Sequence, residues 1–94
     1  MKTIWKFQLK HTAEQEIELP IGAQIISVQR QGDDATLWAL CTPSEEKVKR
    51  TILMYGTGHI IRDDDLTYLG TVLVHADMLV IHIFERPTPN ENIN

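Results

Sequence analysis

The residues best suited to chemistry stand together in the segment Tyr55-Gly56-Thr57-Gly58-His59. A run typical of a β-strand ends at this point, and two glycines bracket a threonine before the histidine. Glycine permits positive φ, so the backbone amides of such a loop can converge on an anion. Thr57 adds a hydroxyl, and His59 and Arg62 add charge-assisted donors. The loop therefore predicts a binding site for a small anionic, nucleotide-like ligand.

Aromatic side chains could complete this site as a stacking wall. The four candidates are Trp5, Trp38, Tyr55 and Tyr68. Each is also explained as a core or interface anchor, because large aromatic side chains dominate both environments. The predicted ligand-binding set is Trp38, Tyr55, Gly56, Thr57, Gly58, His59 and Arg62.

The glycine loop has a second interpretation, a bulge or turn that shapes the edge of a sheet. It lacks the lysine and following helix of a phosphate-binding Walker loop, and no Gly-x-Gly-x-x-Gly occurs in the chain. Both interpretations stay open on the sequence.

Metal binding and catalysis are poorly supported. Asp63-Asp64-Asp65 follows His59 closely but lacks the spacing of a calcium loop, and adjacent aspartates are typical of a solvated turn. No serine or cysteine nucleophile stands beside a histidine in a recognisable pattern. We therefore expect no metal, no cofactor and no enzymatic activity; an enzyme acting through His59 and the aspartates is the remaining alternative.

Two further histidines, His75 and His82, flank the expected turn Ala76-Asp77. Hairpin pairing about that turn places residue 75 near residue 78, so the two histidines do not form a ligand pair. His82 interrupts the apolar run Leu79–Phe84, and we predict that it is hydrogen-bonded at a sheet surface.

Composition limits the classes of partner. The chain has 94 residues, 13 acidic against nine basic, and a formal charge of −4, so a nucleic-acid-binding role is disfavoured. Cys41, the single cysteine, lies in an apolar run and is expected in the core. No secretory signal and no apolar run long enough to span a membrane is present, which predicts a cytoplasmic protein.

Alternating polar and apolar residues predict β-strands throughout. The expected strands are residues 3–10, 15–19, 23–31, 35–42, 48–55, 68–75 and 78–85. The pattern indicates an all-β fold, or a β-rich one with a short helix near Ser44–Val48: a small antiparallel sandwich or partly closed barrel of about seven strands. The first two strands are expected to pair as a hairpin, with Lys6 and Lys10 facing the glutamates of the second. Residues 1–86 would form one domain and residues 87–94 a flexible tail.

Several short sequence words occur together in this chain. They are Ile4-Trp5-Lys6-Phe7, Pro20-Ile21-Gly22-Ala23, Leu37-Trp38-Ala39-Leu40, Tyr55-Gly56-Thr57-Gly58-His59, Tyr68-Leu69-Gly70-Thr71 and His82-Ile83-Phe84-Glu85. The combination resembles an uncharacterised family of small bacteriophage and prophage proteins. In that family a proline often follows the loop histidine, whereas Ile60 stands here. The resemblance implies an accessory protein made in the bacterial host cytoplasm, and supplies no catalytic residues.

Two hypotheses follow for function. The first is a homo-oligomeric counter-defence protein that sequesters a nucleotide-like ligand at the glycine loop. The second is an inhibitor or scaffold that docks on a host defence protein through an acidic surface. The acidic residues concerned, which ordinary solubility also explains, are Glu14, Glu16, Glu18, Asp33, Asp34, Glu45, Glu46, Asp63, Asp64 and Asp65.

Overall fold

Alternation of buried and exposed side chains organises the whole chain into strands. The computed structural model describes residues 1–87 and contains seven strands and no helix over that range. The strands are β1 (Thr3–Gln8), β2 (Glu14–Pro20), β3 (Gln24–Gln31), β4 (Asp34–Cys41), β5 (Lys47–Tyr55), β6 (Thr67–Val74) and β7 (Leu79–Arg86). The all-β prediction is confirmed. The short helix near Ser44–Val48 is absent: β5 begins at Lys47, where β-branched residues follow. Of the predicted tail, all but Pro87 lies outside the described residues.

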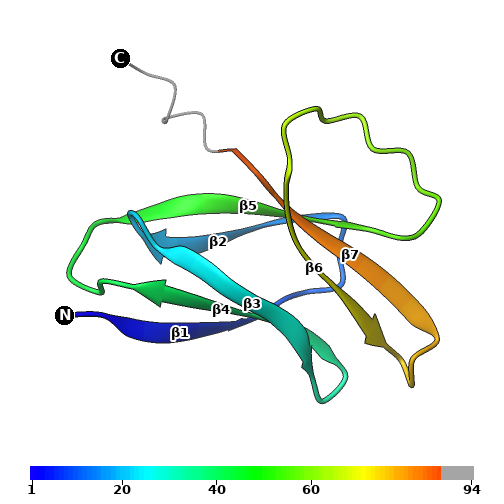
Figure 1. Cartoon of the computed structure of the whole chain (residues 1–94), viewed down its shortest axis with the longest axis horizontal. Coiled ribbons are helices and arrows are strands. Elements are labelled where there is room, and N and C mark those ends of the chain that lie inside the picture. Colours follow the sequence, from blue (N-terminus) through cyan, green and yellow to red (C-terminus); the bar gives the residue numbers. More distant parts are fainter. Residues whose placement is uncertain (88–94) are drawn as a thin grey trace.

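Two antiparallel sheets pack face to face as a sandwich (Figure 1), with strand orders β1-β4-β3 and β2-β5-β7-β6. β3 of one sheet lies against β6 of the other. The sheets do not close into a barrel, so of the two predicted architectures the sandwich is the correct one. No helix in the described residues is long and apolar enough to cross a membrane.

The core lies between the sheets and is built from the inward half of each alternation. β4 contributes Ala35, Leu37, Ala39 and Cys41, all at most 2% exposed. Cys41 is thus a core residue, and β4 is the central strand of its sheet, both as predicted.

The predicted hairpin between the first two strands is wrong. β1 pairs antiparallel with β4, with Lys6 opposite Trp38, and β2 pairs antiparallel with β5, with Glu18 opposite Lys49. The turn after β1 therefore carries the chain from one sheet to the other. Alternation specifies which face of a strand is buried, but pairing with a distant strand decided the partner.

A partly buried ion pair links the two sheets. The Arg50 guanidinium donates to both carboxylate oxygens of Glu85 at 2.5 and 2.8 Å, and to the carbonyl oxygen of Ala23 at 2.6 Å. Arg50 and Glu85 are only 16% and 13% exposed. Because Ala23 directly precedes β3, Arg50 links the four-stranded sheet to the chain entering the three-stranded one.

Candidate functional site

The loop between β5 and β6 begins with a small closed turn. The His59 amide donates to the carbonyl oxygen of Gly56 at 3.2 Å, and the Gly56 amide donates to Nδ1 of His59 at 3.1 Å. A Cβ on Gly56 would lie 3.1 Å from the His59 ring, and Gly58 has a φ of 89°. Gly58 is therefore favoured by its positive φ, and a side chain at position 56 would require the His59 ring to shift.

This turn changes what the loop can offer a ligand. The Gly56 amide, one of the predicted anion donors, already has His59 as its acceptor. Because Nδ1 of His59 accepts a hydrogen bond, the proton of the neutral ring lies on Nε2, on an exposed side chain. His59 therefore presents an N–H donor to the surroundings.

Thr57 joins the loop to the outer face of the four-stranded sheet. Its Oγ1 lies 2.8 Å from Nε2 of His82 on β7, and Nδ1 of His82 lies 3.0 Å from Oγ1 of Thr71 on β6. The Tyr68 hydroxyl lies 2.6 Å from the same Thr71 oxygen. His82 is thus hydrogen-bonded at a sheet surface, as predicted.

Strand register explains why these groups meet. Ile81 and Ile83 are core residues, so His82 between them points to the opposite, outer face of the sheet. Pairing places His82 opposite Thr71 on one side and Tyr55 on the other. We call the hydrogen-bonded series Tyr68–Thr71–His82–Thr57 the hydroxyl chain.

The hydroxyl chain is directional. A neutral imidazole has one donor and one acceptor nitrogen, so the tautomer of His82 sets which way donation runs at Thr57 and Thr71. If Nε2 of His82 donates to Thr57, the Thr57 hydroxyl proton is free for an outside acceptor. If Thr57 donates to Nε2, the free proton is that of Tyr68 or of Thr71, because the Thr71 oxygen can accept two hydrogen bonds. With neutral His82, one hydroxyl of the series always has a proton to offer.

An aromatic cluster lies beside the hydroxyl chain. Phe84 contacts Tyr55 and Tyr68 edge-on, with ring centroids 5.8 and 5.4 Å apart, and Tyr68 is 58% exposed. Phe84, Thr71 and His82 are absent from the predicted set of ligand residues. The alternation of β7, which puts His82 and Phe84 on one face, was the available signal for two of them.

Trp38 does not belong to this surface. It lies on β4 of the three-stranded sheet, and its neighbours Leu37 and Ala39 are in the core, so its side chain is on that sheet's outer face. The structure thus brings Tyr55 and the loop residues Gly56–His59 together but places Trp38 on the opposite side of the sandwich.

Two charged residues of the loop have different surroundings. Asp63 accepts from Nη2 of Arg86 at 3.2 Å, and Glu14 accepts from the same nitrogen at 3.3 Å. These hydrogen bonds, that to Asp63 first, hold the pKa of Arg86 above its ordinary value. Arg62 is exposed and makes no ion pair with any residue in 1–87.

His75 lies apart from this site, at the β6–β7 turn. Its amide and its Nδ1 contact the two carboxylate oxygens of Asp33 at 2.6 and 3.0 Å. The Met78 amide donates to the His75 carbonyl oxygen at 3.1 Å, which confirms that residue 75 lies near residue 78. Within residues 1–87 no group of three or more His, Cys, Asp or Glu side chains could hold a metal ion.

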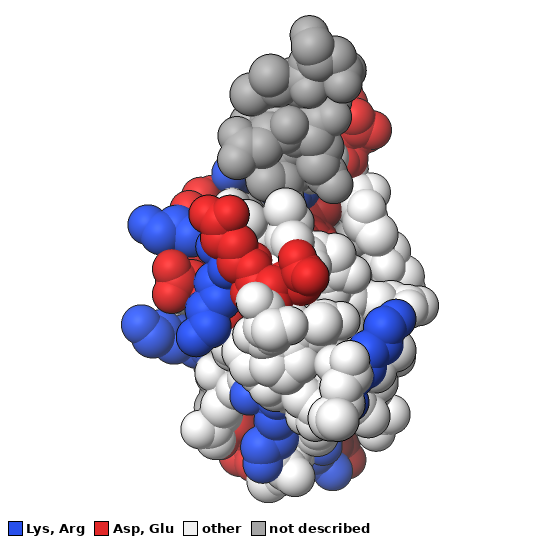
Figure 2. Space-filling model, turned by 90° about the vertical axis from the view of Figure 1, so that its left-hand side faces the viewer, with Lys and Arg blue, Asp and Glu red and all other residues white. Residues whose placement is uncertain are grey.

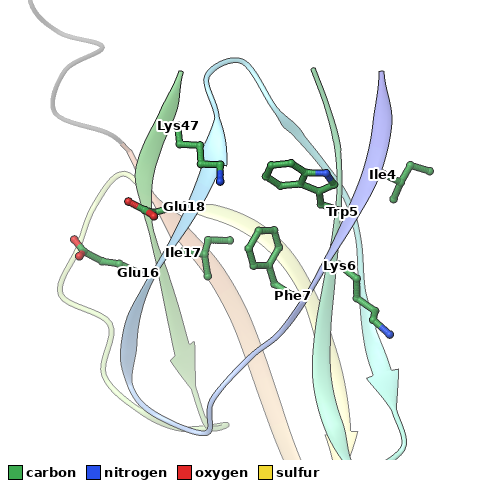
Figure 3. Close-up of a pocket in the computed structure, with 8 residues that line it drawn as sticks. All are labelled: Ile4, Trp5, Lys6, Phe7, Glu16, Ile17, Glu18 and Lys47. Atoms are coloured by element: carbon green, nitrogen blue, oxygen red, sulfur yellow. The ribbon is translucent and has the colours of Figure 1, made fainter. Parts of the chain in front are cut away.

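A groove of about 730 Å³ lies elsewhere, at the edge of the sandwich between β1 and β2 (Figure 3). Trp5 and Phe7 from β1 and Ile17 from β2 point into it, and Lys47 Nζ lies 5.4 Å from the centroid of the Trp5 ring. Nothing in the alternation of either strand indicated a groove, because both alternations are those of ordinary half-buried strands.

Comparison with protein families matches the whole chain, residues 1–94, to one family model, described as Domain of unknown function (DUF7352). The chain belongs to this family. Comparisons with curated proteins and with solved structures found no match. The DUF7352 match agrees with the resemblance to an uncharacterised family.

Proposed function

We propose that this protein acts by binding, and that its ligand is a small anionic molecule with a planar ring, of the nucleotide class. The ligand would lie on the outer face of the four-stranded sheet, beside the loop that contains Gly56–His59. The observation that supports this most is the hydroxyl chain that joins Thr57 to His82 next to the Tyr55–Phe84–Tyr68 cluster.

The aromatic cluster suits a planar ring. Tyr68 is exposed and supported from behind by Phe84, so its position is maintained without a ligand. Base–aromatic stacking contributes about 1–3 kcal/mol per base in other proteins.

The polar groups of the hydroxyl chain and of the β5–β6 loop suit an anion. One hydroxyl of the chain offers a proton, His59 offers Nε2–H, and the loop carries Arg62, a cation that is unpaired within residues 1–87. Hydrogen bonds to a charged acceptor are stronger than those between neutral groups.

In the setting that resemblance to phage proteins implies, such binding would sequester a nucleotide signal of a bacterial defence system. The protein would then need no catalytic residues. Its effect would depend on its concentration relative to the signal.

The alternative, docking on a defence protein through an acidic surface, has less support. Acidic and basic side chains are intermixed on the side of the molecule shown in Figure 2. Glu14 and Asp63 are paired with Arg86, Asp33 with His75, and Glu18 stands opposite Lys49 in the sheet. The negative residues thus do not form one continuous field.

The test is calorimetric titration and native mass spectrometry with nucleoside monophosphates, diphosphates and cyclic dinucleotides. We expect one class to bind, and Thr57→Val to weaken that binding about tenfold or more, because a hydrogen bond to a charged group contributes about 1.5–3 kcal/mol. The matched control is Thr12→Val, in the exposed turn between β1 and β2, which should bind normally. Absence of binding by every nucleotide at millimolar concentration would disprove the proposal.

A further inference from the structure

Two strand edges on one side of the sandwich have no pairing partner within residues 1–87. In that part of the chain β1 pairs only with β4 and β2 only with β5, so each is the edge strand of its sheet. Both line the groove shown in Figure 3, so the two free edges lie side by side. An edge strand presents unpaired amide and carbonyl groups, which can template pairing with another chain.

The apolar interior is accessible between these edges. Trp5 and Phe7 are half-buried and Ile17 points toward them across the groove. The groove between the two edges is open to the surface. A partner that pairs with the two edges would extend the core over these side chains.

The outer faces of the two edges carry opposite charge. Lys6 points away from the groove on β1, and Glu16 and Glu18 point away from it on β2. Glu16 and Glu18 form no ion pair within residues 1–87, and the Lys6 ammonium donates only to the Gln31 side chain, at 3.0 Å. The opposite charges of β1 and β2 therefore do not meet each other within the described residues of one chain.

We propose that these edges form a two-fold interface with a second copy of the chain, in which β1 of each copy pairs antiparallel with β2 of the other. β1 and β2 run in opposite directions, joined by the turn at one end of the groove (Figure 3). A two-fold axis parallel to the strands places each β1 beside the other copy's β2, and both pairs form at once.

Side-chain alternation fixes which residues meet. In one register Lys6 lies opposite Glu16, and Trp5 lies opposite Ile17. In the register shifted by two residues Lys6 lies opposite Glu18, and Phe7 lies opposite Ile17. Both registers keep the aromatic rings inside and the opposite charges outside, whereas a shift of one residue would reverse the faces. Each pair would span the six residues of β1, about 20 Å.

Other pairings of two copies are disfavoured by the same charges. A two-fold axis perpendicular to the sheets would pair β2 with β2, setting the outward glutamates against each other. The same axis would pair β1 with β1, so Lys6 of each copy would face β1 of the other copy and not the glutamates of β2. Like charges directly opposite destabilise a strand pair.

The first experiment is sedimentation and native mass spectrometry of the whole chain and of charge-reversed variants. We expect the wild type to dimerise, and Lys6→Glu and the double variant Glu16→Lys/Glu18→Lys each to weaken the dimer at least tenfold. An equimolar mixture of the two variants should form a mixed dimer, because opposite charges then meet at both strand pairs. Glu45→Lys, in the exposed turn before β5, is the control and should dimerise like the wild type.

A second measurement needs no variant. Zero-length carbodiimide coupling of mixed ¹⁴N- and ¹⁵N-labelled wild-type protein should join Lys6 of one isotope to Glu16 or Glu18 of the other. A wild-type protein that remains monomeric at about 1 mM, far above a micromolar dissociation constant, would overturn the proposal. So would a dimer that is unchanged by both charge reversals and gives no such cross-link.

Discussion

The two sides of this sandwich use their residues differently. On the β3–β6 side, Gly70 lies against Val28, Arg30 pairs with Asp77 at 2.8 Å, and Asp33 holds the His75 amide. On the β1–β2 side Lys47 contacts the Trp5 ring across the groove, and within residues 1–87 Glu16 and Glu18 form no ion pair.

This difference separates groups that maintain the fold from groups that are available to a partner. On the β3–β6 side, which we call the joined side, the polar groups form hydrogen bonds and ion pairs with one another, so substitutions there should change stability. We call the β1–β2 side the open side. On the open side, within residues 1–87, the strand edges are unpaired and Lys6, Glu16 and Glu18 form no ion pair, so substitutions there should change association and leave the fold intact. Arg50 stands between the two sides, opposite Ile17 in the pairing of β2 with β5, whereas Gly70 and the contact of Asp33 with His75 belong to the joined side.

The largest effect is expected from Arg50, which crosses between the sheets. Arg50→Met should lower the free energy of unfolding by as much as about 3–5 kcal/mol, because the partly buried Glu85 carboxylate is left without its partner. Urea denaturation measures the change.

The matched control for Arg50 is the double variant Arg50→Met/Glu85→Leu. It removes both charges and should lose less stability than Arg50→Met alone. A double variant that loses as much as the single one would show that the ion pair itself, and not the orphaned carboxylate, dominates.

A smaller effect is expected where the sheets approach closely. A Cβ on Gly70 would lie 3.4 Å from both Cβ and the carbonyl oxygen of Val28. Gly70→Val should therefore cost about 1–3 kcal/mol through overpacking, and Gly70→Ala less. Thermal denaturation measures the change. If Gly70→Val were as stable as Gly70→Ala, the prediction would be contradicted, because β3 and β6 would then have room to separate.

The smallest change in stability is expected at the exposed hydrogen bonds between Asp33 and His75. The His75 amide hydrogen bond, followed by the side-chain contact and the charges of His75 and His11, holds the pKa of Asp33 below its ordinary value of 3.8. A lowered folded-state pKa means stability that is present above the unfolded pKa and is lost as pH falls through the folded pKa.

The measurement for Asp33 compares the wild type with Asp33→Asn in chemical denaturation over a series of pH values. Asp33→Asn should be less stable near neutral pH, and the gap should narrow as pH falls below about 4, where the carboxylate takes up a proton. Asp64→Asn, on the exposed loop before β6, should show no such gap. If the difference in stability between the wild type and Asp33→Asn did not change with pH, the carboxylate charge would not be what stabilises the turn.

The sequence by itself determined the seven strands, the buried position of Cys41, the central place of β4 and the surface hydrogen bonding of His82. These features depend on alternation along a single strand, which repeats every two residues and is visible locally. The loop residues Gly56–His59 were recognisable for the same reason, because glycine spacing is a local property.

Only the tertiary structure decided which strands pair and which surfaces result. Alternation in β1 and β2 fits a hairpin and a sheet-to-sheet crossing equally well, and pairing with β4 and β5 selected the crossing. Such long-range pairing explains the contact of Thr57 with His82 and the ion pair of Arg50 with Glu85. It also explains why Trp38 lies on the opposite face of the sandwich. Local patterning determines which face of each strand is buried, whereas the choice of neighbouring strands depends on the free energy of the whole packed sandwich.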